Sequence, residues 1–293
     1  MWSRLPPWLK QRAPEPSVLD EMKTLLEGLS LHTVCKEAHC PNQGRCFSQG
    51  TATFLILGDV CTRNCRFCAV KKGKPLPLDP DEPWNVAQAV SQLRLNHVVI
   101  TSVTRDDLPD GGARHYVKTI EAIRQTNPQA TVEVLIPDFL GSFEALKMLV
   151  DSSPEVINHN VETVPRLYPE VRPKADYHRT LNLLGTVKSM DKRIVTKSGM
   201  MLGLGERGDE IIRVMRELRE VGCDAITLGQ YLCPSPQHHP VSRYLPPEAF
   251  EEYRWIAERL GFKSVASGCF VRSSFNALGM YKEVKGLDQA SVF

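Results

Sequence analysis

The sequence predicts an α/β protein built as a partial (β/α)6 TIM-like barrel with N-terminal and C-terminal extensions. From residue 51 onward, strand-like apolar runs alternate with helical patterns six times, which is typical of parallel strands joined by helical crossovers. The length of 293 residues suits six such units better than eight. Cysteine-containing and polar stretches follow the strand-like runs, where parallel α/β folds place their chemistry. An open doubly wound sheet would show the same alternation, so spacing alone leaves both architectures open.

Three segments are expected. Residues 1–50 form an N-terminal extension, with a proline-containing arm over 1–20 and an amphipathic helix over 18–30. Residues 51–261 form the barrel, and residues 262–293 form a C-terminal extension that opens with a short mixed piece at 263–267. Within the barrel, strands are expected at 51–58, 97–103, 131–137, 156–162, 193–205 and 225–232, and helices at 84–95, 112–125, 142–150, 176–190, 209–221 and 247–260.

The composition is that of an ordinary globular protein, with 42% hydrophobic and 24% charged residues and a net charge of +2. This charge gives no reason to expect a nucleic-acid partner. No apolar run approaches the roughly 20 residues of a membrane helix, and no secretory signal opens the sequence, so we expect no membrane association. Six of the nine cysteines fall between residues 35 and 68. Such clustering favours metal ligation in a reducing compartment, and the cytoplasm is the expected location.

The most specific feature is the triplet Cys61, Cys65 and Cys68, spaced C-x3-C-x2-C directly after the first expected strand. Three thiolates on one loop can hold three irons of a cubane cluster and leave the fourth iron open to a small molecule. Structural zinc loops usually supply four ligands in C-x2-C pairs, so zinc fits this spacing less well. The triplet resembles the signature of radical S-adenosylmethionine (SAM) proteins.

A second triplet, Cys35, Cys40 and Cys46, is spaced C-x4-C-x5-C. No regular element places all three thiols on one face, so we expect a bound metal to arrange this loop. A second three-thiolate cluster would lack a fourth protein thiol, and a histidine, a hydroxyl, a substrate or nothing could take that place. Two structural zinc ions, or one shared binuclear zinc site, are the alternative.

Polar residues at the ends of later strands are candidates for cofactor contacts. Asn158, Asn160 and Glu162 alternate along one expected strand and would share a face, from which they could bind a ribose or form a buried packing network. Gly203, in a glycine-containing turn, would let backbone approach a flat ring, although a plain turn has the same pattern. Lys197 could face a carboxylate or remain solvated.

Other polar stretches have simpler interpretations. His39 and the pair His238–His239 suggest metal ligands, but surface histidines are more common. The basic run 71–74 could receive an acidic protein or be a solvated face. The acidic residues of 105–110 have no nearby nucleophile that would support hydrolysis.

Longer stretches resemble the lipoyl synthase family, in register from about residue 18 to 281. They are Cys35-Lys-Glu-Ala-His-Cys-Pro-Asn42, Gly50–Asp59, Thr101–Gly112, Asn158-His-Asn-Val-Glu-Thr-Val-Pro165, Gly229-Gln-Tyr-Leu232 and Arg272-Ser-Ser-Phe275.

The resemblance implies two [4Fe-4S] clusters and SAM as cofactors. Cys61, Cys65 and Cys68 would hold the catalytic cluster, and Cys35, Cys40 and Cys46 the auxiliary cluster. Ser274 matches the family's serine ligand to the auxiliary cluster, and Phe67, Asn158, Asn160, Glu162, Lys197 and Gly203 are assigned to SAM. The sequence departs from the family at Phe275, where tyrosine is usual, and at Cys269, where proline is common.

The implied activity is that of a sulfurtransferase. It inserts two sulfur atoms at C6 and C8 of an octanoyl group, with the auxiliary cluster as the sulfur donor. The implied partners are an octanoylated lipoyl carrier (H protein or the lipoyl domain of a 2-oxoacid dehydrogenase) and a low-potential donor such as ferredoxin or flavodoxin. A radical SAM enzyme whose auxiliary cluster only transfers electrons, and a zinc-stabilised binding module, are the alternatives.

Overall fold

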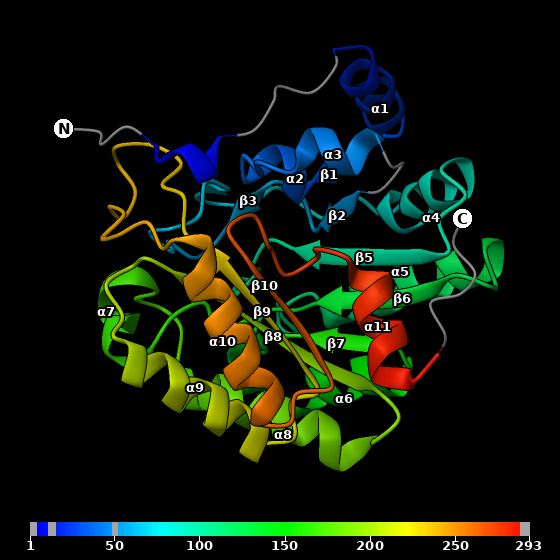
Figure 1. Ribbon diagram of the computed structural model, residues 1–293. Coiled ribbons are helices and arrows are strands. Elements are labelled where there is room, and N and C mark those ends of the chain that lie inside the picture. The colour runs from blue at the N-terminus through cyan, green and yellow to red at the C-terminus, as the bar shows by residue number, and fades with distance from the viewer. Residues whose placement is uncertain (1–4, 11–15, 49–51, 288–293) are drawn as a thin grey trace.

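A mostly parallel eight-stranded sheet forms the centre of the computed structural model, which describes residues 5–10, 16–48 and 52–287 (Figure 1). The strand order is β1-β2-β5-β6-β7-β8-β9-β10. These strands are β1 His32–Thr33, β2 Thr53–Ile56, β5 His97–Ser102, β6 Thr131–Leu135, β7 Val156–Asn158, β8 Val195–Leu202, β9 Ala225–Gln230 and β10 Ser264–Gly268. Strand β1 pairs antiparallel with β2, and every other pairing in this sheet is parallel. The predicted α/β fold with a partial barrel is confirmed.

Helices connect the strands and pack around the sheet (Figure 1). The crossover helices are α4 Glu82–Gln92, α5 Ala113–Thr126, α6 Phe143–Asp151, α8 Tyr177–Met190, α9 Gly208–Glu220 and α10 Pro247–Arg259. Additional helices are α1 Pro16–Gly28, α2 Val34–Glu37, α3 Gln43–Ser48, α7 Tyr168–Val171 and α11 Ala277–Lys285, with 3-10 turns η1 Pro7–Leu9, η2 Phe139–Gly141 and η3 Pro165–Leu167. A separate two-stranded pair, β3 Val60–Cys61 and β4 Lys71–Lys72, flanks the first cysteine triplet.

Burial and local capping explain why these elements form. Strands β2, β7 and β9 are buried along their whole length, as expected for parallel strands covered on both faces. Asp176 caps α8 by accepting a hydrogen bond from the backbone of Arg179, and Ser142 caps α6 through Ala145. The apolar residues of strands and crossover helices belong to one continuous core.

Two differences from the predicted elements matter for the site. Residues 264–268 form a seventh parallel strand, β10, although their sequence, Ser-Val-Ala-Ser-Gly, shows no strand-like apolar alternation. The strand expected over 156–162 ends at Asn158 and is followed by one isolated bridge between Glu162 and Met200. Glu162 has a φ of 62°, so the period-two alternation does not continue to the end of the predicted strand.

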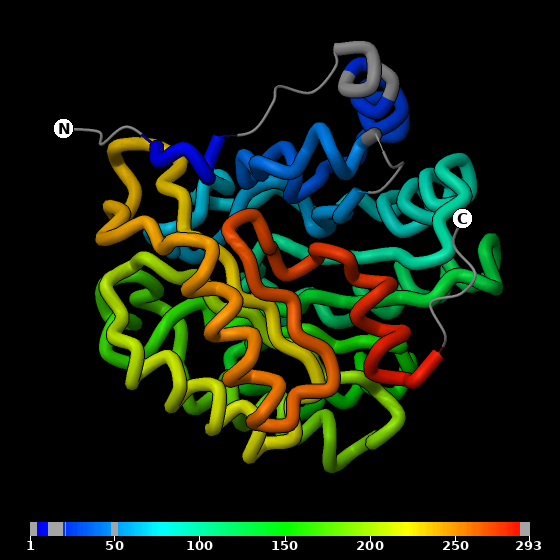
Figure 2. The backbone as a smooth tube through the Cα atoms, viewed as in Figure 1, coloured from blue at the N-terminus to red at the C-terminus, as the bar shows by residue number. Residues whose placement is uncertain are grey.

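The N-terminal helices and the segment after β10 meet at the carboxyl end of the sheet. Asn42 donates a 2.6 Å hydrogen bond to the carbonyl of Phe270, and Figure 2 shows the orange-red segment near residue 270 beside the blue N-terminal helices. Strand β1 forms one edge of the sheet and β10 forms the other. The division at residues 50 and 261 stays a prediction. None of the helices in the described ranges is long and apolar enough to cross a membrane.

Candidate functional site

A cavity of about 1150 Å³ opens at the carboxyl end of the parallel strands. Both cysteine triplets line it, together with the segment that follows β10. The sequence-predicted site residues in its wall are Cys35, Cys40, Cys46, Cys61, Cys65, Phe67, Cys68, Asn160, Glu162 and Ser274. Tertiary folding therefore brings residues from four separate parts of the chain to one chamber.

The loop that carries Cys61, Cys65 and Cys68 is fixed by backbone hydrogen bonds to several neighbouring loops. The amide of Thr62 donates to the carbonyl of Thr104 at 3.0 Å, and the amide of Arg66 donates to that of Val171 at 2.9 Å. His238 Nε2 lies 3.1 Å from the carbonyl oxygen of Cys68. These contacts hold the three thiols at the mouth of the barrel.

The second triplet lies on two short helices and the turn between them. Cys35 belongs to α2, Cys46 belongs to α3, and the backbone amide of Cys40 donates a 3.0 Å hydrogen bond to the carbonyl of Cys35. Thr33 caps α2 by accepting from the backbone of Lys36. The cap and the two short helices thus contribute to placing these thiols at the cavity, and the arrangement of the loop by a bound metal stays a prediction.

The segment that carries Ser274 reaches the cavity because a glycine lets it pack closely on β9. A Cβ atom at Gly229 would lie 2.0 Å from the carbonyl oxygen of Val271. Only glycine permits this approach. Phe275, the departure from the family's tyrosine, lies beneath the guanidinium of Arg45 at 5.5 Å from ring centroid to carbon.

Each triplet offers three sulfur donors to an iron–sulfur cluster, and burial keeps these groups protonated until a cation binds. Burial raises the pKa of Cys35 and of Cys68 to about 12, and burial also raises that of Cys65 against the opposing charge of Arg172. At neutral pH these groups are therefore thiols unless a cation binds them, and cluster binding would displace their protons. No group of three or more His, Cys, Asp and Glu side chains in the described part is gathered around a single-ion position. Cluster ligands instead bind different iron atoms. Two sets of three sulfur donors with one hydroxyl fit two [4Fe-4S] clusters.

Asn160 and Glu162 form a polar wall beside the triplet of Cys61, Cys65 and Cys68. Asn160 Nδ2 donates to Glu162 Oε1 at 3.0 Å, while the buried Asn160 Oδ1 has no hydrogen-bond partner. Burial raises the pKa of Glu162, partly offset by the buried Arg172. A Cβ atom at Gly199 would lie 2.9 Å from Asn160 Oδ1, so this glycine keeps the space in front of the free oxygen open. These groups fit a polar ligand such as the sugar of SAM.

Asn158, Lys197 and Gly203 lie outside the cavity wall, contrary to their assignment as cofactor contacts. Lys197 Nζ forms a 2.9 Å ion pair with Glu133 Oε1, and Asn158 Nδ2 lies 3.4 Å from the same oxygen. The side chains of Lys197, Asn158 and Glu133 are all fully buried. Gly203 has a φ of 103° and packs against the carbonyl of Arg243 and the amide of Gln230. Alternation along β7 turns Asn158 toward the barrel interior, and Glu133 binds Lys197 there.

The histidines and the acidic loop have structural partners. His238 contacts the carbonyl of Cys68, and His239 Nε2 lies 3.1 Å from the carbonyl of Leu204. His39 is exposed at the cavity rim. In the acidic loop of residues 105–110, Asp106 binds Arg63 and Asp107 binds Arg105. Because Arg63 lies between Cys61 and Cys65, the acidic loop supports the loop that carries these cysteines.

Sequence reasoning missed several arginines that face or support the cavity. Arg172 donates to the carbonyls of Asn160 and Val161 at 2.9 and 3.1 Å. Arg63, between two of the cysteines, binds Asp106 and Asp138. Arg272 lines the cavity and donates to the carbonyl of Val271 at 2.8 Å. Only the position of Arg63 within the triplet gave a sequence signal for its role.

The fold and the site together define a radical SAM protein. The profile of the radical SAM superfamily matches residues 55–230, and that of the N-terminal domain of lipoyl synthase matches residues 2–40. Streptococcus suis SuiB bound to S-adenosylmethionine shares the fold, with a TM-score of 0.58 and 14% identity over 85% of this chain and 60% of that chain. Methylornithine synthase shares it with a TM-score of 0.53 and 12% identity over 72% and 70% of the two chains.

Named relatives place the chain within one family of radical SAM proteins. The lipoyl synthase of Caldanaerobacter subterraneus is 57% identical over 94% of this chain and 97% of its own length. That of Rubrobacter xylanophilus is 53% identical over 93% and 85% of the two chains. The chain therefore belongs to the lipoyl synthase family.

Proposed function

We propose that this protein is a sulfurtransferase that inserts two sulfur atoms at C6 and C8 of an octanoyl group carried by a lipoyl domain. One observation carries the proposal: both cysteine triplets and Ser274 line a single cavity. Hydrogen removal and sulfur delivery must act on the same alkyl chain, and a shared chamber meets that requirement. Family membership supports the same activity.

Each wall of the cavity has an assigned role. Cys61, Cys65 and Cys68 hold the catalytic [4Fe-4S] cluster, and Cys35, Cys40, Cys46 and Ser274 hold the auxiliary cluster. Phe67, Asn160 and Glu162 contact SAM, whereas Asn158, Lys197 and Gly203 support that site from behind. When bound, SAM and the clusters supply the radical that removes hydrogen from unactivated carbons and the sulfur that replaces it.

The protein binds and orients the substrate. Apolar groups in the cavity wall, among them Val99, Val103, Leu135 and Met201, offer an alkyl chain a surface between the two triplets. The buried Asn160 and the half-buried Glu162 fix the polar cofactor on one side of that surface. A chamber that excludes water restricts a reactive intermediate to its target carbon.

The acyl chain arrives on a lipoyl carrier protein, which we propose is the H protein or the lipoyl domain of a 2-oxoacid dehydrogenase. A low-potential donor such as ferredoxin or flavodoxin supplies electrons. Six of the nine cysteines fall between residues 35 and 68, and this clustering supports a reducing location, the cytoplasm.

Mass analysis of an octanoyl-lysine peptide after anaerobic turnover tests the activity. The unaltered protein should yield the dithiol product, whereas an enzyme with an electron-transfer auxiliary cluster would consume SAM without adding sulfur to the peptide. Iron and sulfide quantitation of anaerobically purified protein should give about eight of each per chain for two cubane clusters. Colourless protein containing zinc would refute the proposal.

Paired cysteine variants separate the roles of the two triplets. Cys65→Ala should abolish methionine formation from SAM. Cys40→Ala should still release 5'-deoxyadenosine but form no lipoyl product. Cys269→Ala is the matched control, because this thiol lies outside the cavity wall, and it should retain both activities. Sulfur insertion by Cys40→Ala at the unaltered rate would contradict the donor assignment.

A further inference from the structure

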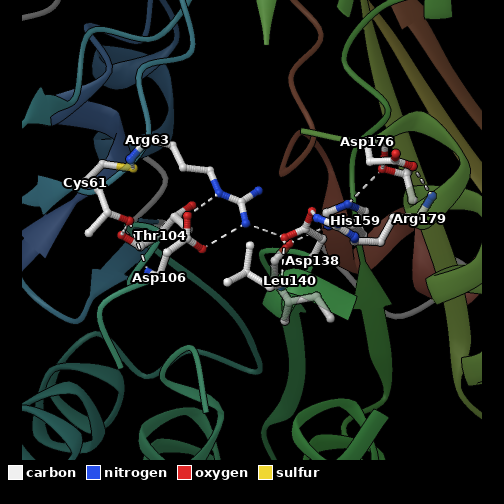
Figure 3. A network of polar contacts seen from close by, with 12 residues as sticks. Cys61, Arg63, Thr104, Asp106, Asp138, Leu140, His159, Asp176 and Arg179 are labelled. Atoms are coloured by element: carbon white, nitrogen blue, oxygen red, sulfur yellow. Dashed lines mark hydrogen bonds and ion pairs between the residues drawn. The ribbon is translucent and has the colours of Figure 1, made fainter. Parts of the chain in front are cut away.

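A buried arginine lies within the cluster loop that carries Cys61, Cys65 and Cys68. The side chain of Arg63 is only 5% exposed. Its Nε and Nη2 atoms bind the two carboxylate oxygens of Asp106 at 2.8 and 2.9 Å, and Nη2 also binds Asp138 Oδ1 at 2.5 Å (Figure 3). The cluster loop is thus joined to the loop after β5 and to the loop after β6.

Both carboxylates are themselves held in place. The amide of Asp106 donates to Thr62 Oγ1 at 3.1 Å, and that hydroxyl donates to the carbonyl of Thr104 at 2.9 Å. Asp138 Oδ2 binds Arg179 Nη1 at 3.0 Å (Figure 3). Two arginines and two aspartates make a charge-balanced network, which needs no cluster charge to be satisfied.

The backbone that follows Asp138 is held in an unfavourable conformation. Phe139 and Leu140 have φ angles of 46° and 52°, and Gly141 follows at 82°. Left-handed backbone is costly for two consecutive residues with side chains and persists where neighbouring contacts enforce it. Here Asp138 Oδ1 accepts from the amide of Leu140 at 3.1 Å and from Arg63 at the same time. The strained turn therefore aims the carboxylate at the cluster loop.

The network also affects a contact to sulfur. The backbone amide of Arg63 donates to Cys61 Sγ at 3.4 Å. Holding the side chain of Arg63 limits the backbone angles of that residue and keeps its N–H group directed at the thiol. Hydrogen bonds to ligand sulfur atoms stabilise the reduced form of a cluster and raise its reduction potential.

We propose that Arg63, clamped by Asp106 and Asp138, is a positioning residue that shapes the cluster loop before the cluster binds and holds a backbone N–H against the Cys61 sulfur. The proposal rests on the proposed function in one respect, namely that Cys61, Cys65 and Cys68 are cluster ligands. The clamp itself involves only groups of the polypeptide.

The test compares Arg63→Lys with the unaltered protein. Lysine keeps the charge, but its single ammonium cannot reproduce the planar fork that binds two carboxylates. Hydrogen exchange of peptides covering residues 61–68 should be about tenfold faster or more in the variant, with and without bound cluster, because the loop opens more often. Arg193→Lys is the control, since Arg193 binds both carboxylate oxygens of Asp191 with a similar fork on an 85% exposed side chain. This control should exchange like the unaltered protein.

Two further measurements use a protein that also carries Cys35→Ala, Cys40→Ala and Cys46→Ala. In this background, bound iron can come only from the cluster held by Cys61, Cys65 and Cys68. The Arg63→Lys form should lose iron to a chelator faster and have a more negative midpoint potential. Should Arg63→Lys fail to fold by circular dichroism, Asp138→Asn gives the same comparison, because it keeps the shape and removes the charge.

The clamp would be refuted if Arg63→Lys matched the unaltered protein in hydrogen-exchange rate, in the rate of iron loss to a chelator and in midpoint potential. Failure of the unaltered protein to bind iron through the first triplet would instead refute the proposed function, while the exchange data without cluster would still report on Arg63.

Discussion

The buried ion pair between Lys197 and Glu133 provides the sharpest stability prediction. Both side chains are 1% exposed, and His97 Nε2 approaches the second Glu133 oxygen at 3.6 Å. Burial alone would raise the pKa of Glu133, but Lys197 and His97 outweigh it and hold the pKa at about 2 instead of 4.5. Because the folded pKa is lowered, this stabilisation is present above pH 4.5 and is lost as the pH falls toward 2. At neutral pH it amounts to about 3 kcal/mol.

Lys197→Met removes the cation and leaves Glu133 buried without its main partner. We expect a loss of about 3–5 kcal/mol in the free energy of unfolding at pH 8, and a fall in Tm of about 6–12 °C or more. The loss should shrink toward pH 5, because the unpaired Glu133 then takes up a proton in the folded variant. Urea unfolding followed by circular dichroism at pH 5 and pH 8 measures both quantities.

Two further variants decide whether the reasoning is correct. Lys197→Met/Glu133→Gln should recover most of the lost stability, because no charge remains unpaired. Lys263→Met is the matched control: it removes a 56% exposed lysine from Asp224, which keeps Lys188, and should cost no more than about 1 kcal/mol. A loss for Lys197→Met that is independent of pH and is not relieved by Glu133→Gln would refute the ion-pair account.

Three variants address the cavity. Gly229→Ala should displace the segment after β10, because the new Cβ would lie 2.0 Å from the carbonyl of Val271; iron per chain should fall by half, and full iron content would count against this packing. Ser274→Ala should slow lipoyl product formation and speed loss of auxiliary iron to a chelator, whereas unchanged turnover and iron retention would exclude the hydroxyl as a ligand. Asn160→Ala should weaken SAM binding about tenfold, consistent with one lost hydrogen bond to the free Oδ1; equilibrium dialysis measures this affinity, and an unchanged value would place the cofactor elsewhere.

The contribution of the sequence is clearest for the βα alternation and the cysteine triplets. Apolar periodicity predicted six strands and six crossover helices, because burying one face of each element is a local requirement. The triplets were equally readable, since ligands within one short loop are close in space whatever the surrounding fold. Strand β10 was missed because its pairing with β9, and not its own polar sequence, makes it a strand.

Contacts between distant residues were decided only by the tertiary structure. Lys197 and Glu133 are 64 positions apart, and Arg63 and Asp138 are 75 apart. No local pattern distinguishes a lysine that binds a cofactor from one that neutralises a buried carboxylate. Alternation along one strand likewise could not tell that Asn160 would reach the cavity while Asn158 stayed inside the barrel. The sequence thus determined which groups could do chemistry, and the packing of the βα loops against one another determined which of them face the same chamber.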